Sequence, residues 1–420
     1  MVIGVIGPEY RKRLVDHLLD ELLEQAPAIL LTGPRAAGKT TTAARRAARV
    51  VQLAAGAQAA AFLADPDAAL RGLEEPVLLD EWQEVPGVLG AARRAVDADP
   101  RPNRFYLTGS VTAVGASEMW PGTGRLVRVP MYPMTQRELR GDISGKPFFD
   151  RVADGDELTV PADSPDLLAY TELSLQSGLP MPALSMSGRP RSMWLESYLD
   201  DLLTRDVQEL GDHPGRGRDT HLLRRYFEAY ALNSAGLAEH KTIYDAAGIT
   251  KSTAAAYEQL LMRLLVVDQI PAWTSNRLKR LIRAPKRYVT DAALIGAALR
   301  LDARGILSDG NLLGRTLDTF VVSQLRPETG LSATRPRLYH LRTEGGRHEI
   351  DLVAELGGQR LVAVEVKASA APSDEDARHL HWLRDEIGSR FLAGVVLHTG
   401  PRVYRLGERI VAAPISTLWG

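Results

Sequence analysis

The chain has 420 residues, of which 45% are hydrophobic, and its formal net charge at pH 7 is −1. This length allows two to four domains with buried cores, and the near-neutral charge excludes a polycation, so any surface for nucleic acid must be local. The absence of cysteine excludes disulfides, cysteine-based zinc sites and thiol catalysis. We expect a cytoplasmic protein without membrane contact, because no secretory signal and no bilayer-spanning apolar run is evident.

The strongest motif is a glycine-rich loop between a predicted strand and a predicted helix. An amphipathic helix over 10–24 and a strand over 28–31 precede the sequence Gly-Pro-Arg-Ala-Ala-Gly-Lys-Thr, and a helix over 38–51 follows. This spacing is typical of the phosphate-binding loop of nucleoside triphosphatases, although a chance match in a chain rich in glycine and alanine is the alternative. The glycines would turn backbone N–H groups toward phosphates, the lysine would contact the β- and γ-phosphates, and the threonine would bind Mg²⁺. The predicted ATP-binding residues are Gly33, Pro34, Arg35, Ala36, Ala37, Gly38, Lys39, Thr40 and Thr41.

Two further predicted strands end in polar residues. The stretch 76–82 is a short apolar run that ends in Asp80 and Glu81, as expected for a buried parallel strand. Asp80 would complete the Mg²⁺ shell and Glu81 would activate the attacking water, although many strands end in acidic residues. The strand over 104–110 ends in Thr108 and Ser110, which either sense the γ-phosphate or simply form a turn at the intervening glycine.

Arg125 precedes a fourth predicted strand over 127–131. It is a candidate to neutralise transition-state charge, either in its own subunit or across the interface of a homo-oligomer. An ordinary surface arginine is the alternative.

The series GPRAAGKT, LLDEW, FYLTGS, GR and YPMTQRE within residues 33–138 resembles a prokaryotic family of P-loop ATPases of the AAA superfamily. Further matches lie at 177–180 and 198–206, so the resemblance covers nearly the whole chain. It implies a central winged helix and a C-terminal domain of unknown function with a restriction-endonuclease-like core. Many members carry GPRQVGKT, and the pair Ala36-Ala37 departs from that pattern.

The middle of the chain predicts a helix-turn-helix. A short helix over 242–248 ends in glycine, and a second helix from 249 begins with hydroxyl residues. The start of that helix would face DNA phosphates or base edges, although many winged helices mediate only protein contacts. A run over 277–287 holds six basic residues and no acid, which favours DNA over a simply solvated segment. The predicted contacts are Lys251, Ser252, Thr253, Arg277, Lys279, Arg280, Arg283, Lys286 and Arg287.

The C-terminal region predicts a cluster of carboxylates. Strands over 349–353 and 361–366 would pair as a hairpin and bring Asp351 close to Glu365, with Lys367 on the same face as Glu365. Two carboxylates that bind Mg²⁺ or Mn²⁺, together with a lysine, can form a phosphodiesterase site. The resemblance to restriction endonucleases adds Asp318 as a third metal ligand. Such cores are often kept as binding scaffolds, so activity stays open.

We therefore predict an α/β protein in four parts. A P-loop parallel sheet flanked by helices occupies 1–145, an irregular and helical connector 146–217, a winged helix-turn-helix 218–290, and an α/β restriction-endonuclease-like domain 291–420. The predicted function is MgATP hydrolysis in a protein that binds DNA and carries a nuclease-like domain. The alternative is an ATP-controlled switch whose inactive nuclease-like domain recruits an unknown protein partner.

Overall fold

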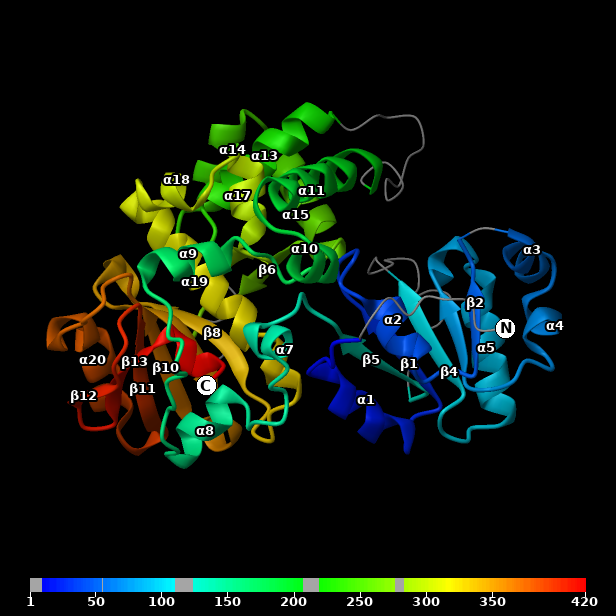
Figure 1. Cartoon of the computed structure of the whole chain (residues 1–420), viewed down its shortest axis with the longest axis horizontal. Coiled ribbons are helices and arrows are strands. Elements are labelled where there is room, and N and C mark those ends of the chain that lie inside the picture. The colour runs from blue at the N-terminus through cyan, green and yellow to red at the C-terminus, as the bar shows by residue number, and fades with distance from the viewer. Residues whose placement is uncertain (1–9, 55, 110–123, 207–218, 276–282) are drawn as a thin grey trace. The chain divides into compact units, whose positions relative to one another are not determined.

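The computed structural model describes residues 10–54, 56–109, 124–206, 219–275 and 283–420 (Figure 1). The chain forms two compact units, one of residues 1–134 with 263–265 and the other of 135–262 with 266–420. The first division thus falls after Met134 and not after residue 145. The reason is that the next helix is bonded to the second unit, through Gln136 to Gln324 and Arg137 to Glu328.

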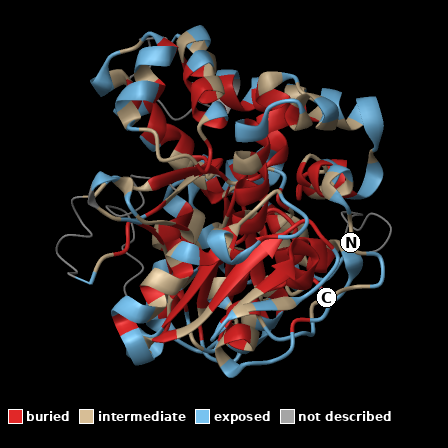
Figure 2. Cartoon of the chain, turned by 90° about the vertical axis from the view of Figure 1, so that its left-hand side faces the viewer, coloured by how far each residue is buried: buried red, intermediate tan, exposed pale blue. Residues whose placement is uncertain are grey.

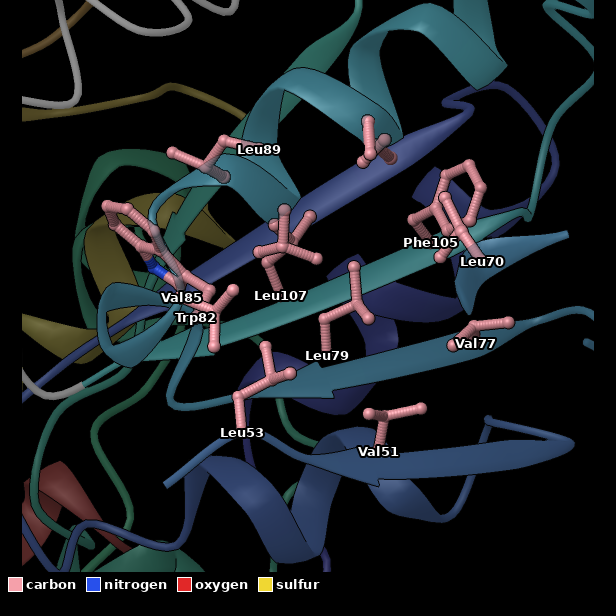
Figure 3. Packing of buried hydrophobic residues seen from close by; sticks show 14 of the residues in the cluster. Val51, Leu53, Leu70, Val77, Leu79, Trp82, Val85, Leu89, Phe105 and Leu107 are labelled. Atoms are coloured by element: carbon pink, nitrogen blue, oxygen red, sulfur yellow. The ribbon is translucent and has the colours of Figure 1, made fainter. Parts of the chain in front are cut away.

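The first unit is built on a parallel sheet in the order β2-β3-β4-β1-β5. Apolar residues fill both faces of the sheet, as expected for strands covered by helices on both sides. Leu79 and Leu107 pack on one face with Leu89 of α5 (Figure 3), whereas Leu78 packs on the other face with Leu19 of α1. The strands are β1 Ala28–Thr32, β2 Arg49–Gln52, β3 Val77–Asp80, β4 Phe105–Gly109 and β5 Leu126–Pro130. The helices are α1 Val15–Leu23, α2 Lys39–Ala44, α3 Gly56–Ala64, α4 Pro66–Leu70 and α5 Gly87–Ala98.

The second unit holds a mixed sheet in the order β12-β13-β11-β10-β9-β8. The predicted hairpin is present, with Val364 opposite Leu352 in antiparallel register. Leu380 and Leu383 of α20 (Arg378–Ile387) pack on this sheet, and Figure 2 shows the buried parts of its strands in red. The strands are β8 Arg337–Arg342, β9 Glu349–Glu355, β10 Leu361–Val366, β11 Phe391–His398, β12 Tyr404–Gly407 and β13 Ile410–Pro414.

Helices make up most of the rest of the second unit, and a two-stranded antiparallel sheet, β6 Val267–Ile270 with β7 Lys286–Val289, lies among them. The predicted irregular and helical connector over 146–217 begins with α8, in which Phe148 and Phe149 are buried and Asp150 accepts hydrogen bonds from Ser332 and Thr334. These contacts order the segment. No helix in the described part of the chain is both long and apolar enough to cross a membrane. The helices are α7 Gln136–Arg140, α8 Phe148–Asp154, α9 Leu167–Ser174, α10 Pro180–Ser185, α11 Gly188–Asp201, α13 Thr220–Leu232, α14 His240–Ala247, α15 Lys251–Arg263, α17 Ala293–Leu299, α18 Ala303–Leu307, α19 Gly310–Leu325 and α20 Arg378–Ile387.

Candidate functional site

The glycine-rich loop runs from the carboxyl end of β1 into α2, at the sheet edge where β3 and β4 also end. Gly38 has a φ of 93° and Ala36 a φ of 59°, so the chain turns twice through the left-handed region. At Gly33 a Cβ atom would lie 2.2 Å from the carbonyl oxygen of Met131. Both predicted glycines are therefore required, one by conformation and one by space.

Lys39 is buried, with 6% of its surface exposed. Its Nζ atom donates hydrogen bonds to the carbonyl oxygens of Gly33 at 3.0 Å and Pro34 at 2.8 Å. Burial lowers the pKa of Lys39 to about 8, although the charges of Glu81 and Asp80 act in the opposite direction. The ammonium group thus lies over the loop in an environment where an added anion would favour its charged form.

Asp80 is where two hydroxyl groups meet. Its Oδ1 atom accepts hydrogen bonds from Thr40 Oγ1 at 2.8 Å and from Thr108 Oγ1 at 2.5 Å. The parallel register places Asp80 directly beside Thr108, and the loop carries Thr40 to them. The structure thus brings together three residues that the sequence predicted on three separate segments. Hydroxyl and carboxylate oxygens are ligands that suit Mg²⁺.

Glu81 follows Asp80 in an unusual backbone conformation, with φ 52° and ψ 51°. This conformation costs free energy in residues other than glycine. It persists where the surrounding structure holds the backbone, often at functional sites. Gln83 donates a hydrogen bond to the Glu81 carboxylate. Trp82 and Gln83 approach β4 so closely that a Cβ at Gly109 would lie 2.9 Å from Trp82 Nε1. The neighbouring predicted residue, Ser110, lies outside the described residues.

Arg125 does not reach this site within its own chain. It precedes β5, whose first residue pairs with Ala28 at the start of β1, whereas the loop follows the other end of β1. The two ends are roughly 13 Å apart along the strand. Arg125 is exposed and forms an ion pair with Asp97 of α5. The predicted role in its own subunit is therefore wrong, and a role across a subunit interface stays a prediction.

Arg13 is a residue that the sequence pattern missed, since it looked like one of several basic residues on the polar face of a helix. It is 4% exposed, and its guanidinium group donates to the carbonyl oxygens of Ala37 and Tyr132, both at 2.7 Å. Its backbone N–H donates to Asp16, whose carboxylate also pairs with Arg46, which follows the end of α2. Arg13 thus fixes the phosphate loop to the segment after β5. Nothing in the local spacing marks it, because both acceptors are backbone atoms.

The predicted C-terminal carboxylates do come together, but a lysine lies between two of them. Lys286 Nζ donates to Asp318 Oδ2 at 2.6 Å and to Asp351 Oδ1 at 2.9 Å, and it is 2% exposed. Lys367 Nζ donates to Glu365 at 3.2 Å, and burial raises the pKa of Glu365 well above its usual range. In the described part of the chain no group of three His, Cys, Asp or Glu residues could hold a metal ion. The predicted metal site is therefore corrected to a buried ion-pair cluster.

The predicted nucleic-acid contacts separate into two groups. Lys251 and Ser252 are exposed at the start of α15, and Thr253 is half-buried. Lys286 and Arg287 are buried, and Arg287 pairs with Glu258 at 2.6 Å. Lys286 and Arg287 cannot contact nucleic acid, because their cationic groups are bonded to carboxylates inside the fold. Arg283 is half-buried, and Arg277, Lys279 and Arg280 lie outside the described residues.

Three stretches of the chain match known families. Residues 25–140 match an AAA domain, residues 168–305 a domain of unknown function (DUF8612), and residues 313–418 another domain of unknown function (DUF4143). The Walker-type ATPase PABY2304 of Pyrococcus abyssi is 16% identical to this chain, which it matches over 68% of this chain and 94% of its own, with a TM-score of 0.41.

Two uncharacterized mycobacterial proteins are relatives over almost the full length. Protein Rv2008c of Mycobacterium tuberculosis and protein Mb2031c of Mycobacterium bovis are each 30% identical over 409 residues, which is 95% of this chain and 82% of theirs. The AAA match confirms the predicted P-loop core, whereas the winged helix and the nuclease-like domain stay predictions. The chain belongs to the family of these mycobacterial proteins, and its residues 25–140 match an AAA domain.

Proposed function

We propose that the chain hydrolyses MgATP at the carboxyl edge of its parallel sheet. The observation that carries this proposal is the meeting of Thr40 and Thr108 on one oxygen of Asp80, beside the buried ammonium of Lys39. A loop that only bound an anion would need neither the carboxylate nor the second hydroxyl. Together they form the metal-binding and phosphate-sensing side of a nucleotide site.

Each residue has a role that follows from its position. Lys39 neutralises charge on the β- and γ-phosphates, and Glu81 accepts a proton from the attacking water. Thr40 and Asp80 would hold Mg²⁺, which neutralises charge that develops on the phosphate oxygens when it is bound. Thr108 holds Asp80 in place through its hydrogen bond.

Two substitutions test hydrolysis. Lys39→Ala is expected to abolish ATP turnover, whereas Lys12→Ala, which removes an exposed lysine of the same unit, should leave turnover unchanged. Glu81→Gln is expected to bind ATP and retain it without release of phosphate. Unchanged phosphate release by Lys39→Ala would overturn the proposal, and wild-type turnover by Glu81→Gln would remove Glu81 from it.

We further propose that the chain associates with DNA through α14 and α15. Support comes from the turn at Gly248, the hydroxyl-rich start of α15 and the neighbouring β6–β7 hairpin, a combination expected of a winged helix. Lys251→Glu should weaken binding to duplex DNA. It should also reduce the slope of log K against log salt concentration by about one. Arg360→Glu makes the same charge change at an exposed position just before β10 and serves as the control. The absence of any gel shift at low salt would favour the alternative, an ATP-controlled switch for a protein partner.

For the C-terminal domain we propose a nuclease-like scaffold without nuclease activity. The supporting observation is Lys286, whose ammonium group lies between the carboxylates that a metal would need. Plasmid and single-stranded DNA, incubated with Mg²⁺ or Mn²⁺ with and without ATP, should stay intact. Metal-dependent nicking that disappears in Asp351→Ala and Lys367→Ala would show instead that the domain is a nuclease.

A further inference from the structure

A pocket of about 270 Å³ lies in the second unit between the segment after β6, the end of β8 and helix α20. We propose that it binds one nucleotide of a single-stranded nucleic acid, with the base against indole rings and the phosphate against arginines. The proposal rests on the proposed association with nucleic acid and deepens it, because it names a second site and the strand form that this site accepts.

Two tryptophans supply the aromatic surface of the pocket. Trp273 is 7% exposed and is fixed by its indole N–H, which donates to Glu355 Oε2 at 3.2 Å, and by its backbone N–H, which donates to the His340 carbonyl at 2.6 Å. Trp382 is half-buried, and His348 stacks on one of its faces with ring centroids 4.1 Å apart and planes at 6°. Trp382 thus lines the pocket with an indole whose orientation is held by the stacked His348 ring. Fixed aromatic rings of this kind stack on any base.

Arginines supply the complementary charge. Arg283, Arg342 and Arg390 line the pocket, and among the described lining residues Glu386 alone carries a carboxylate. Arg283 is held by a hydrogen bond of 2.6 Å to the Arg342 carbonyl. Guanidinium groups bind phosphate oxygens in pairs of parallel hydrogen bonds. A pocket with two indoles and an excess of guanidinium groups thus fits an aromatic anion, and its small volume suits one unit of a strand.

The pocket is close to the carboxylate cluster. His348, which stacks on Trp382, also approaches His379 with 3.4 Å between their Nδ1 atoms. The pocket residue Arg342 lies opposite Glu349 in the β8–β9 register, two positions before Asp351. A strand held in the pocket would therefore lie beside the edge that carries Asp351 and Lys367. Under this proposal the C-terminal domain binds a single strand beside its carboxylate cluster without cleaving it.

The test compares the binding of a labelled oligothymidylate, a blunt duplex and AMP to the full-length chain by fluorescence anisotropy and competition. Trp382→Ala and Arg390→Glu should each raise the Kd for the single strand about tenfold, and Trp382→Phe should stay within about threefold of wild type. Duplex binding should change less than twofold in all three variants, because the pocket does not accept a base pair. The matched controls are Trp194→Ala, a half-buried indole on α11, and Arg360→Glu. ATP turnover of every variant should equal that of wild type.

The outcomes separate the two proposals. Wild-type single-strand affinity in both Trp382→Ala and Arg390→Glu, with duplex binding intact, would overturn the pocket and leave DNA association standing. The absence of all nucleic-acid binding by the wild type at low salt would overturn both. Competition by AMP as strong as that by the strand would show that the pocket takes a free nucleotide, which also contradicts the proposal. If Trp382→Ala fails to fold, Arg390→Glu still decides, because it changes a half-buried side chain in the turn after α20 and not a core residue.

Discussion

At the scale of single residues, Arg13 shows how a position outside the glycine-rich motif can control it. Its two hydrogen bonds end on the Ala37 carbonyl in the loop and on the Tyr132 carbonyl after β5. A buried charged donor that is lost leaves both acceptors unsatisfied, and hydrogen bonds to charged groups contribute about 1.5–3 kcal/mol each. Part of that loss should fall on the ordering of the loop, and so on ATP affinity.

Arg13→Ala is therefore expected to raise the Kd for ATP about tenfold, which corresponds to about 1.4 kcal/mol, and to lower the thermal stability of the first unit. A titration with a fluorescent ATP analogue measures the affinity. Arg11→Ala removes an exposed arginine from the same stretch and should bind as wild type does. Equal affinity in the two variants would show that the loop is ordered without Arg13.

His340 predicts a loss of stability in mild acid. It is 3% exposed, one ring nitrogen bonds to the Ala284 carbonyl, and Nδ1 has no hydrogen-bond partner in the described part of the chain. Burial lowers the pKa of His340 to about 4. The unfolded chain takes up a proton below about pH 6.5, whereas the folded chain does so only near pH 4. The contribution of neutral His340 to the free energy of unfolding is therefore fully present above about pH 6.5. It is lost as the pH falls from about 6.5 to about 4.

At pH 5 the loss should be about 2 kcal/mol relative to pH 7. His340→Gln keeps a hydrogen-bond donor and cannot titrate in this range. Urea unfolding at pH 7 and pH 5 should thus give a smaller difference between the two pH values for the variant than for the wild type. The same pH dependence in both proteins would mean that His340 is protonated in the folded chain.

At the scale of elements, Lys286 joins three segments that are distant in sequence. It lies on β7 and bonds to Asp318 on α19 and to Asp351 on β9. The ammonium group offsets the buried carboxylate of Asp318 and the half-buried one of Asp351, so its removal leaves uncompensated charge. Breaking a buried ion pair by removal of one partner costs about 3–5 kcal/mol.

Lys286→Ala is expected to lower the unfolding temperature of the second unit strongly, and Mn²⁺ should recover part of the loss because the two carboxylates are then free to bind a cation. Mn²⁺ should not shift the unfolding temperature of the wild type. Differential scanning calorimetry with and without MnCl₂ measures both, and Lys241→Ala, at an exposed lysine of α14, is the control. A Mn²⁺-dependent shift in the wild type would show that Lys286 does not exclude a metal.

The same elements show why sequence predicts some features and misses others. The phosphate loop, the acidic end of β3 and the β9–β10 hairpin were predictable, because each is encoded by a short stretch with a fixed period or spacing. Lys286 and Arg287 were predicted as DNA contacts in a basic run, because their acidic partners lie on other elements and are not visible in the local sequence. The position of Arg125 was missed for a similar reason. Only the strand register reveals that it lies at the end of the sheet where β1 begins, opposite the end that carries the loop.

At the scale of the whole molecule, the chain passes directly from the phosphate loop's surroundings into the second unit. The Met131 carbonyl packs against Gly33, and the Tyr132 carbonyl accepts from Arg13. Within six residues of Met131 the chain reaches Arg137, which pairs with Glu328 at 2.6 Å in the second unit. A displacement of the loop on nucleotide binding would therefore act on the segment at Met131 and Tyr132. The helix that follows this segment, α7, is bonded to the second unit.

This path predicts that a nucleotide changes the second unit. A non-hydrolysable ATP analogue should alter amide hydrogen exchange in α7 and at the end of α19, because Gln136 and Arg137 connect these elements through Gln324 and Glu328. Lys39→Ala should abolish the effect. A flexible Gly-Ser insertion between Met134 and Thr135 should retain ATP hydrolysis and lose the change in exchange, because neither anchored segment is altered but the link between them becomes slack. An unchanged response in the insertion variant would mean that the signal reaches the second unit by another route.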